Sequence, residues 1–230
     1  MCSRYTVTSR PDVVRAHFNY LNEAEFPIRE AIAPTDPVMI VRELTKGRRE
    51  MALVRWGFIP HWVKDPDDFP LIINARSETL AEKPSFRSSL AHKRCLFPAD
   101  GFYEWSGPKG KRIAHFLKPT ANTPIAFAGV WDHWQGADGT EFESAAIITV
   151  PANDKISEIH NRMPAVLESF EFDDWLNVTD IRASDAAKML RPSKDTTFNI
   201  IDLDEAPKPA KRNKTKSEYK PPPGSQGELF

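Results

Sequence analysis

Short apolar stretches separated by polar turns dominate the chain, and this pattern is typical of β-strands rather than long helices. Residues 38–44 and 50–55 are expected to form a hairpin through Lys46-Gly47. Residues 145–150 are apolar on both faces of an extended segment, which indicates a strand buried on both faces. The remaining strands are predicted at residues 4–8, 94–97, 102–105, 113–117, 125–131 and 198–201.

Helices are predicted to be few and short. A helix is expected from Ser9, as the N-cap before Pro11, to about Leu21. It would bury Val13, Val14, Phe18 and Leu21. Residues 31–35 read as a turn, and Asn153 is expected to cap a helix that ends near Ile159. Further short helices are predicted at 78–82, 85–91, 170–176 and 184–190.

The predicted strands are short and do not alternate with helices in a βαβ pattern, which predicts an α+β fold. We expect a single domain over residues 2–205, with a curled, barrel-like, mostly antiparallel sheet and peripheral short helices. From residue 206 the composition changes to proline, lysine and small polar residues, so residues 206–230 are expected to be a disordered, basic tail.

Charge restricts how the protein could bind nucleic acid. Six of the 31 basic residues and two of the 32 acidic residues lie in 206–230, which leaves 25 basic and 30 acidic residues in the body. This balance argues against a broad basic face that coats duplex DNA. Any contact with nucleic acid must therefore use a local groove.

Two cysteines cannot build a disulfide framework, which favours a reducing compartment. The sequence shows neither a membrane-spanning apolar run nor a signal-peptide layout, so a cytoplasmic protein is expected. The six histidines are scattered without paired ligand spacing, so neither a metal nor another cofactor is predicted. Nothing in the sequence requires more than a monomer.

Cys2 directly follows the initiator Met1, and removal of Met1 would leave a free α-amine beside a thiol. Both groups are partly in their nucleophilic forms near neutral pH. Such a 1,2-aminothiol can condense with an aldehyde and close a thiazolidine ring, or act as an N-terminal nucleophile with its own amine as base. Cys95 lies in a predicted strand and is interpreted as a small core residue.

Four polar residues stand in apolar surroundings where chemistry could occur. They are Asn74 after Leu71-Ile72-Ile73, Arg76 two residues later, Glu104 between two aromatics, and His160 after Ile159. Together they offer a carboxylate whose pKa burial could raise, a histidine and a hydrogen-bonding amide.

Six ordered motifs resemble those of the SRAP family, the SOS response-associated peptidases. They are Met1 to Tyr5, Ile32 to Thr35, Trp56 to Trp62, Ile73 to Thr79, Arg94 to Trp105 and His160 to Pro164. Members of this family form a covalent thiazolidine between the N-terminal cysteine and the ring-opened aldehyde of an abasic site in single-stranded DNA. The resemblance therefore implies an abasic-site sensor that crosslinks to DNA, shields the lesion during the damage response and processes its own Met1.

The resemblance also implies residue roles. Cys2 would be the nucleophile, Asn74 would orient the N-terminus and the sugar oxygen, Glu104 would be the general acid and base, and His160 would transfer protons. DNA contacts would come from Arg4, Arg76 and Arg162 to phosphates, from Trp62 to an unpaired base, and from Pro34. The body would thus bind single-stranded DNA despite its acidic balance, and the protein would associate with the nucleoid.

The C-terminal residues Gln226-Gly227-Glu228-Leu229-Phe230 resemble peptides that dock on the bacterial sliding clamp. Leu229 and Phe230 would fill an apolar pocket, and Gln226 would supply a polar anchor. Chance similarity remains the alternative, since the motif is short.

Two other functions compete with the DNA-crosslinking hypothesis. One is a cysteine peptidase that uses the same N-terminal nucleophile on protein substrates. The other is a non-catalytic adaptor that tethers a partner to the clamp, in which Cys2 would be dispensable.

Overall fold

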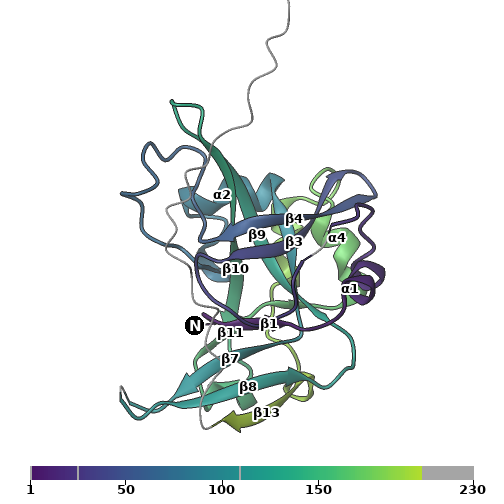
Figure 1. The fold of residues 1–230 in the computed structure, drawn as a ribbon, viewed down its shortest axis with the longest axis vertical. Coiled ribbons are helices and arrows are strands. Elements are labelled where there is room, and N and C mark those ends of the chain that lie inside the picture. The colour runs from purple at the N-terminus through teal and green to yellow at the C-terminus, as the bar shows by residue number, and fades with distance from the viewer. Residues whose placement is uncertain (1, 25, 109, 204–230) are drawn as a thin grey trace, which may run out of the picture.

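The computed structural model describes residues 2–24, 26–108 and 110–203. The predicted tail and clamp peptide, including Gln226, Leu229 and Phe230, lie outside the described residues. The strands of the described residues form two sheets, one of eight strands and one of five. Figure 1 shows the five-stranded sheet, with β7, β8 and β13, at one end and the eight-stranded sheet above it.

Five strands of the larger sheet close into a barrel, in the order β10-β4-β3-β6-β9 and back to β10. Their bounds are β3 Pro37–Thr45, β4 Arg48–Trp56, β6 Arg94–Ala99, β9 Ile125–Gln135 and β10 Glu141–Pro151. Neighbours are antiparallel except β4 and β10, which pair in parallel. Closure removes the exposed edges that an open sheet would have.

Three short strands extend the barrel at β9 and β10. β5 (Asn74–Arg76) runs parallel to β10, β11 (Arg162–Pro164) runs antiparallel to β10, and β12 (Val166–Leu167) pairs with β9. Because β5 and β11 both pair with β10 near its end, two distant parts of the chain come together there.

The second sheet has the order β13-β8-β7-β1-β2 and is antiparallel throughout. Its strands are β1 Tyr5–Val7, β2 Arg29–Ile32, β7 Gly101–Ser106, β8 Ile113–Pro119 and β13 Phe198–Leu203. The predicted α+β fold with a barrel-like, mostly antiparallel sheet and short helices is confirmed.

Aromatic rings join the two sheets in one core. The Tyr5 ring of the small sheet packs edge-on against Trp56, Phe97 and Phe127 of the barrel, with ring centroids 5.3, 6.5 and 6.0 Å away. Residues 145–150 of β10 are all buried, as predicted. Edge-on packing of this kind stabilises beyond simple burial, so β1 is held firmly against the barrel.

The first helix differs from its prediction at both ends. α1 (Pro11–Phe18) has no side-chain cap, because the Ser9 hydroxyl instead donates to the Asp100 carboxylate at 2.5 Å. The helix ends at Phe18, since Asn19 takes a left-handed conformation with φ of 52°. Val14 and Phe18 are buried, but Val13 and Leu21 are 43% and 53% exposed, so their predicted burial is wrong.

Most of the other helices lie near their predicted positions: η1 Ser77–Thr79, α2 Pro84–His92, α3 Asp154–Ser157, η2 Ser169–Glu171, α4 Phe172–Leu176, α5 Ala183–Ala186 and η3 Ala187–Met189. The short helix η4 (Asp195–Thr197) has no counterpart in the sequence prediction. The predicted cap of α3 is present, with the Asn153 side chain accepting from the Ile156 amide at 2.9 Å. The turn expected at 31–35 begins instead as the end of β2. No helix in the described part of the chain is long and apolar enough to cross a membrane.

Candidate active site

Cys2 lies three residues before the first residue of β1, Tyr5, and its side chain is fully buried. The Sγ atom is 3.7 Å from the Arg4 carbonyl oxygen. Burial raises the pKa of the Cys2 thiol far above its ordinary value, and the negative charge of Glu104 adds to this rise. The thiol therefore needs a base before it can react as a thiolate.

Asn74, the first residue of β5, contacts the Cys2 backbone. Its Nδ2 donates to the Cys2 carbonyl oxygen at 2.9 Å, although 71 residues separate the two in sequence. β5 holds Asn74 there by pairing with β10, in the register of Asn74 opposite Ile147. The Asn74 Oδ1 atom is buried and has no hydrogen-bond partner among the described residues, so it can accept a further donor.

Glu104 lies on β7, and only 2% of its surface is exposed. β7 pairs with β1, and the Tyr103 amide donates to the Arg4 carbonyl at 2.9 Å, which brings Glu104 close to the segment that precedes β1 and contains Cys2. Burial raises the pKa of Glu104 to about 7. The carboxyl group is therefore suited to both donating and accepting a proton near neutral pH.

His160 lies between α3 and β11 and is partly buried. The Arg162 amide donates to its Nδ1 at 3.0 Å, which fixes the ring orientation. Burial lowers the pKa of His160 below its ordinary value, so the imidazole is mainly neutral near pH 7.

The predicted DNA contacts occupy different environments. The Arg4 guanidinium lies 5.1 Å from the centre of the Trp105 ring, and Arg76 is exposed on β5. Trp62 is 50% exposed, with its ring edge-on to Phe69. Pro34 is partly exposed in the turn after β2. The structure thus leaves part of the Trp62 and Arg76 side chains accessible.

Arg162 is already engaged by a carboxylate. Its NH2 donates to Glu78 Oε2 at 2.9 Å and to the Thr149 carbonyl at 2.5 Å, and its NH1 donates to Glu78 Oε1. The predicted phosphate contact at Arg162 would have to compete with Glu78.

Sequence analysis did not identify a row of hydrogen-bonded side chains beside Glu104. His115 on β8 lies directly across from Glu104; its Nε2 is 2.7 Å from Ser106 Oγ and its Nδ1 is 2.6 Å from Asp202 Oδ1. These residues come from three strands, β7, β8 and β13. Only the register between strands brings them together, so no sequence motif could have revealed them.

Cys95 is fully buried in β6 and has a strongly raised pKa owing to burial, which fits its interpretation as a core residue. Both cysteines are free. Within the described ranges, no three histidine, cysteine or acidic side chains are grouped as metal ligands would be.

The family model for SOS response associated peptidase (SRAP) matches residues 1–206 of the chain. The chain belongs to the SRAP family. Abasic site processing protein YoqW of Bacillus subtilis (strain 168) is 36% identical over 197 residues, which cover 84% of this chain and 87% of YoqW. Abasic site processing protein HMCES of Gallus gallus is 30% identical over 194 residues, which cover 72% of this chain and 58% of HMCES.

Solved structures share the SRAP fold seen here. A crystal structure of a protein from Bacteroides thetaiotaomicron superposes with a TM-score of 0.80 at 25% identity, covering 88% of this chain and 92% of that protein. A second, from Bordetella bronchiseptica, gives a TM-score of 0.76 at 27% identity and covers 88% and 99%. The barrel and its attached sheet are thus an architecture that this SRAP protein shares with experimentally solved chains.

Proposed function

We propose that this SRAP protein recognises abasic sites in single-stranded DNA and forms a covalent thiazolidine with them through Cys2. The contact that carries the proposal is the hydrogen bond from Asn74 to the Cys2 carbonyl, beside the buried carboxyl group of Glu104. The names of YoqW and HMCES as abasic site processing proteins support the substrate.

The chemistry begins with the α-amine that removal of Met1 would expose on Cys2. The amine attacks the aldehyde carbon of the ring-opened sugar, and loss of water leaves an imine. The Cys2 sulfur then adds to the imine carbon while the nitrogen gains a proton, which closes the thiazolidine ring. Asn74 orients the Cys2 backbone for both steps.

Glu104 supplies and removes protons in these steps. Its pKa of about 7 means that carboxyl and carboxylate forms coexist at neutral pH. The carboxylate can take the proton from the buried Cys2 thiol, and the carboxylic acid can protonate the departing hydroxyl. Neutral His160 would open the sugar ring by proton transfer.

Single-stranded DNA would be held by a few local contacts. Arg4, Arg76 and Arg162 bind phosphates, Trp62 stacks on an unpaired base, and Pro34 packs against the strand. A few guanidinium groups suffice for a groove in a body with more acidic than basic residues. DNA binding of this kind would place the protein on the nucleoid.

The test uses processed protein, with removal of Met1 checked by mass. It is incubated with single-stranded DNA that carries one abasic site and compared with Cys2→Ala on a denaturing gel. We expect a shifted, heat-stable band with the parent protein and none with Cys2→Ala.

The absence of a band from correctly processed protein would overturn the proposal. Turnover of added peptides by the same preparation, abolished in Cys2→Ala, would instead support the N-terminal-nucleophile peptidase. If Cys2→Ala retained full function in the damage response, the adaptor hypothesis would replace both.

A further inference from the structure

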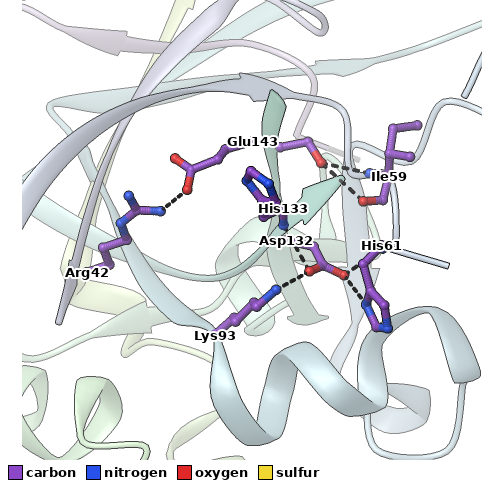
Figure 2. A network of polar contacts seen from close by, with 8 residues as sticks. Arg42, Ile59, His61, Lys93, Asp132, His133 and Glu143 are labelled. Carbon is purple, nitrogen blue, oxygen red and sulfur yellow. Dashed lines mark hydrogen bonds and ion pairs between the residues drawn. The ribbon is translucent and has the colours of Figure 1, made fainter. Parts of the chain in front are cut away.

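Asp132 is a buried carboxylate at the centre of a polar network in the barrel wall (Figure 2). Its side chain is 2% exposed and accepts four hydrogen bonds. The donors are the His61 amide and ring Nδ1, both at 2.9 Å, Lys93 Nζ at 2.5 Å and the His133 amide at 2.9 Å. Burial opposes ionisation of Asp132, but the hydrogen bonds from Lys93 and His61 outweigh it and hold the pKa of Asp132 below its ordinary value.

This network determines which nitrogen of His61 carries a proton. An ionised carboxylate can only accept, so Nδ1 is the donor to Asp132. The other ring nitrogen, Nε2, makes no hydrogen bond to any described residue, and the side chain is 50% exposed. His61 therefore offers a ring nitrogen of fixed orientation to a ligand.

The segment around His61 is anchored on both sides. The Ile59 amide donates to Ser144 Oγ at 2.8 Å, and Trp134 Nε1 donates to the Val63 carbonyl at 2.6 Å. The main-chain bond from His61 to Asp132 already holds this loop, so the imidazole is not needed as an anchor. The next residue is Trp62, also 50% exposed, which the proposed function assigns to base stacking.

We propose that His61 is a phosphate contact for single-stranded DNA, positioned by Asp132 and adjacent to the stacking face of Trp62. The inference rests on the proposed function, since it assumes that DNA passes over Trp62. A phosphate oxygen would accept a hydrogen bond from Nε2–H of protonated His61.

The surrounding charges make this contact sensitive to pH. Lys93 and Asp132 cancel one another, so a proton on His61 gives the cluster a net positive charge. His133, on the adjacent hairpin, faces Glu141 at 3.4 Å. In the loop of His61, the exposed Asp65, Asp67 and Asp68 oppose an anion, and the exposed Lys64 favours one. Because the phosphate contact needs the cationic form of His61, binding through this residue should strengthen as the solution becomes more acidic.

The experiment measures non-covalent binding of a fluorescent, single-stranded oligonucleotide in a Cys2→Ala background, at pH 6 and pH 8 over a series of salt concentrations. Each phosphate neutralised on a single strand contributes about 0.7 to the slope of log K against log salt. We expect the slope of the Cys2→Ala protein to be larger at pH 6 than at pH 8, by at most about 0.7, the contribution of one phosphate contact through His61. Further substitution His61→Gln should remove that gain and weaken binding at pH 6 by about three- to fivefold, the range of an exposed ion pair.

Two matched variants complete the design. His61→Arg carries a permanent charge, so its salt slope at pH 8 should equal the slope of the Cys2→Ala protein at pH 6. His133→Gln changes a histidine that pairs with Glu141 on the adjacent hairpin, so its salt slopes should match those of the Cys2→Ala protein. If His61→Gln keeps the same pH-dependent slope as its parent, the inference is overturned. A failure of the proposed function would give another result. The Cys2→Ala protein itself would then show no salt-dependent affinity for single-stranded DNA.

Discussion

Arg162 of β11 and Glu78 of η1 form a bidentate ion pair. The Arg162 side chain is 12% exposed and that of Glu78 is 47% exposed. The hydrogen bonds from Arg162 hold the pKa of Glu78 at about 2, so the pair stays ionised across the physiological range. A guanidinium that is predicted to bind phosphate is thus occupied by an internal anion.

Removing the negative charge of Glu78, which competes with phosphate for Arg162, should strengthen DNA binding. In Glu78→Gln, Arg162 loses its carboxylate partner and becomes available to a phosphate group. We expect the affinity for single-stranded DNA to rise about threefold, within the range of an exposed ion pair, and Arg162→Ala to lower it by a similar factor. Fluorescence anisotropy at one fixed salt concentration measures both, and weaker binding by Glu78→Gln would show that the pair instead orders Arg162 for the phosphate.

Replacement of Glu104 by glutamine should slow crosslinking by about 100-fold or more, the usual contribution of a general acid–base group. Because the pKa of Glu104 is about 7, the parent rate should change most steeply around that pH, and Glu104→Gln should lose this part of the profile. Initial rates of crosslinking between pH 5.5 and 8.5 measure the effect. An unchanged profile in the variant would assign that titration to another group.

Glu104 should also make stability depend on pH. Its folded pKa lies above the ordinary value of 4.5, so its contribution to stability is fully present below about 4.5 and is lost as the pH rises through 7. The loss amounts to about 3 kcal/mol for a shift of this size. Glu104→Gln should therefore gain stability relative to the parent at pH 8 but not at pH 4.5, as measured by denaturant unfolding.

Arg94 stabilises the packing of α4 against β6. Its side chain is buried and donates to the carbonyl oxygens of Leu90, Trp175, Asn177 and Ile181 at 2.5–3.0 Å. Burial lowers the pKa of Arg94 to about 10, but the guanidinium remains charged at pH 7. Arg94→Met should cost about 3 kcal/mol or more, because it leaves several buried carbonyl groups without donors.

Urea unfolding measures this loss, with Arg182→Met as the control. Among the described residues, the Arg182 side chain pairs only with Asp185, and it is 82% exposed. Its replacement should therefore change stability by less than about 1 kcal/mol. Equal losses in both variants would contradict the structural role of Arg94.

The C-terminal peptide supports a separate prediction about partners. Deleting residues 226–230 should abolish binding to the bacterial sliding clamp while leaving abasic-site crosslinking unchanged, because the family model ends at residue 206. Surface plasmon resonance against immobilised clamp measures the first effect, and the denaturing gel measures the second. Clamp affinity that survives the deletion would end this hypothesis and leave the tail lysines as possible DNA contacts.

Local sequence was sufficient for features that depend on neighbours along the chain. The apolar run at 145–150 identified a buried strand, Lys46-Gly47 marked the hairpin between β3 and β4, and Asn153 marked the start of α3. Each is governed by burial periodicity, turn conformation or a hydrogen bond within a few residues. The same kind of reasoning failed at Ser9, whose hydroxyl bonds to Asp100, 91 residues away, rather than capping α1.

Only the tertiary structure determined what surrounds Cys2. Asn74 reaches the Cys2 carbonyl because β5 pairs with β10, and Glu104 lies nearby because β7 pairs with β1. Sequence motifs identify such residues but do not specify the register in which strands pair. The register depends on which strand faces are buried against one another. The raised pKa of Glu104 and the bond from His61 to Asp132 follow from the same cause, because both require burial by segments remote in sequence.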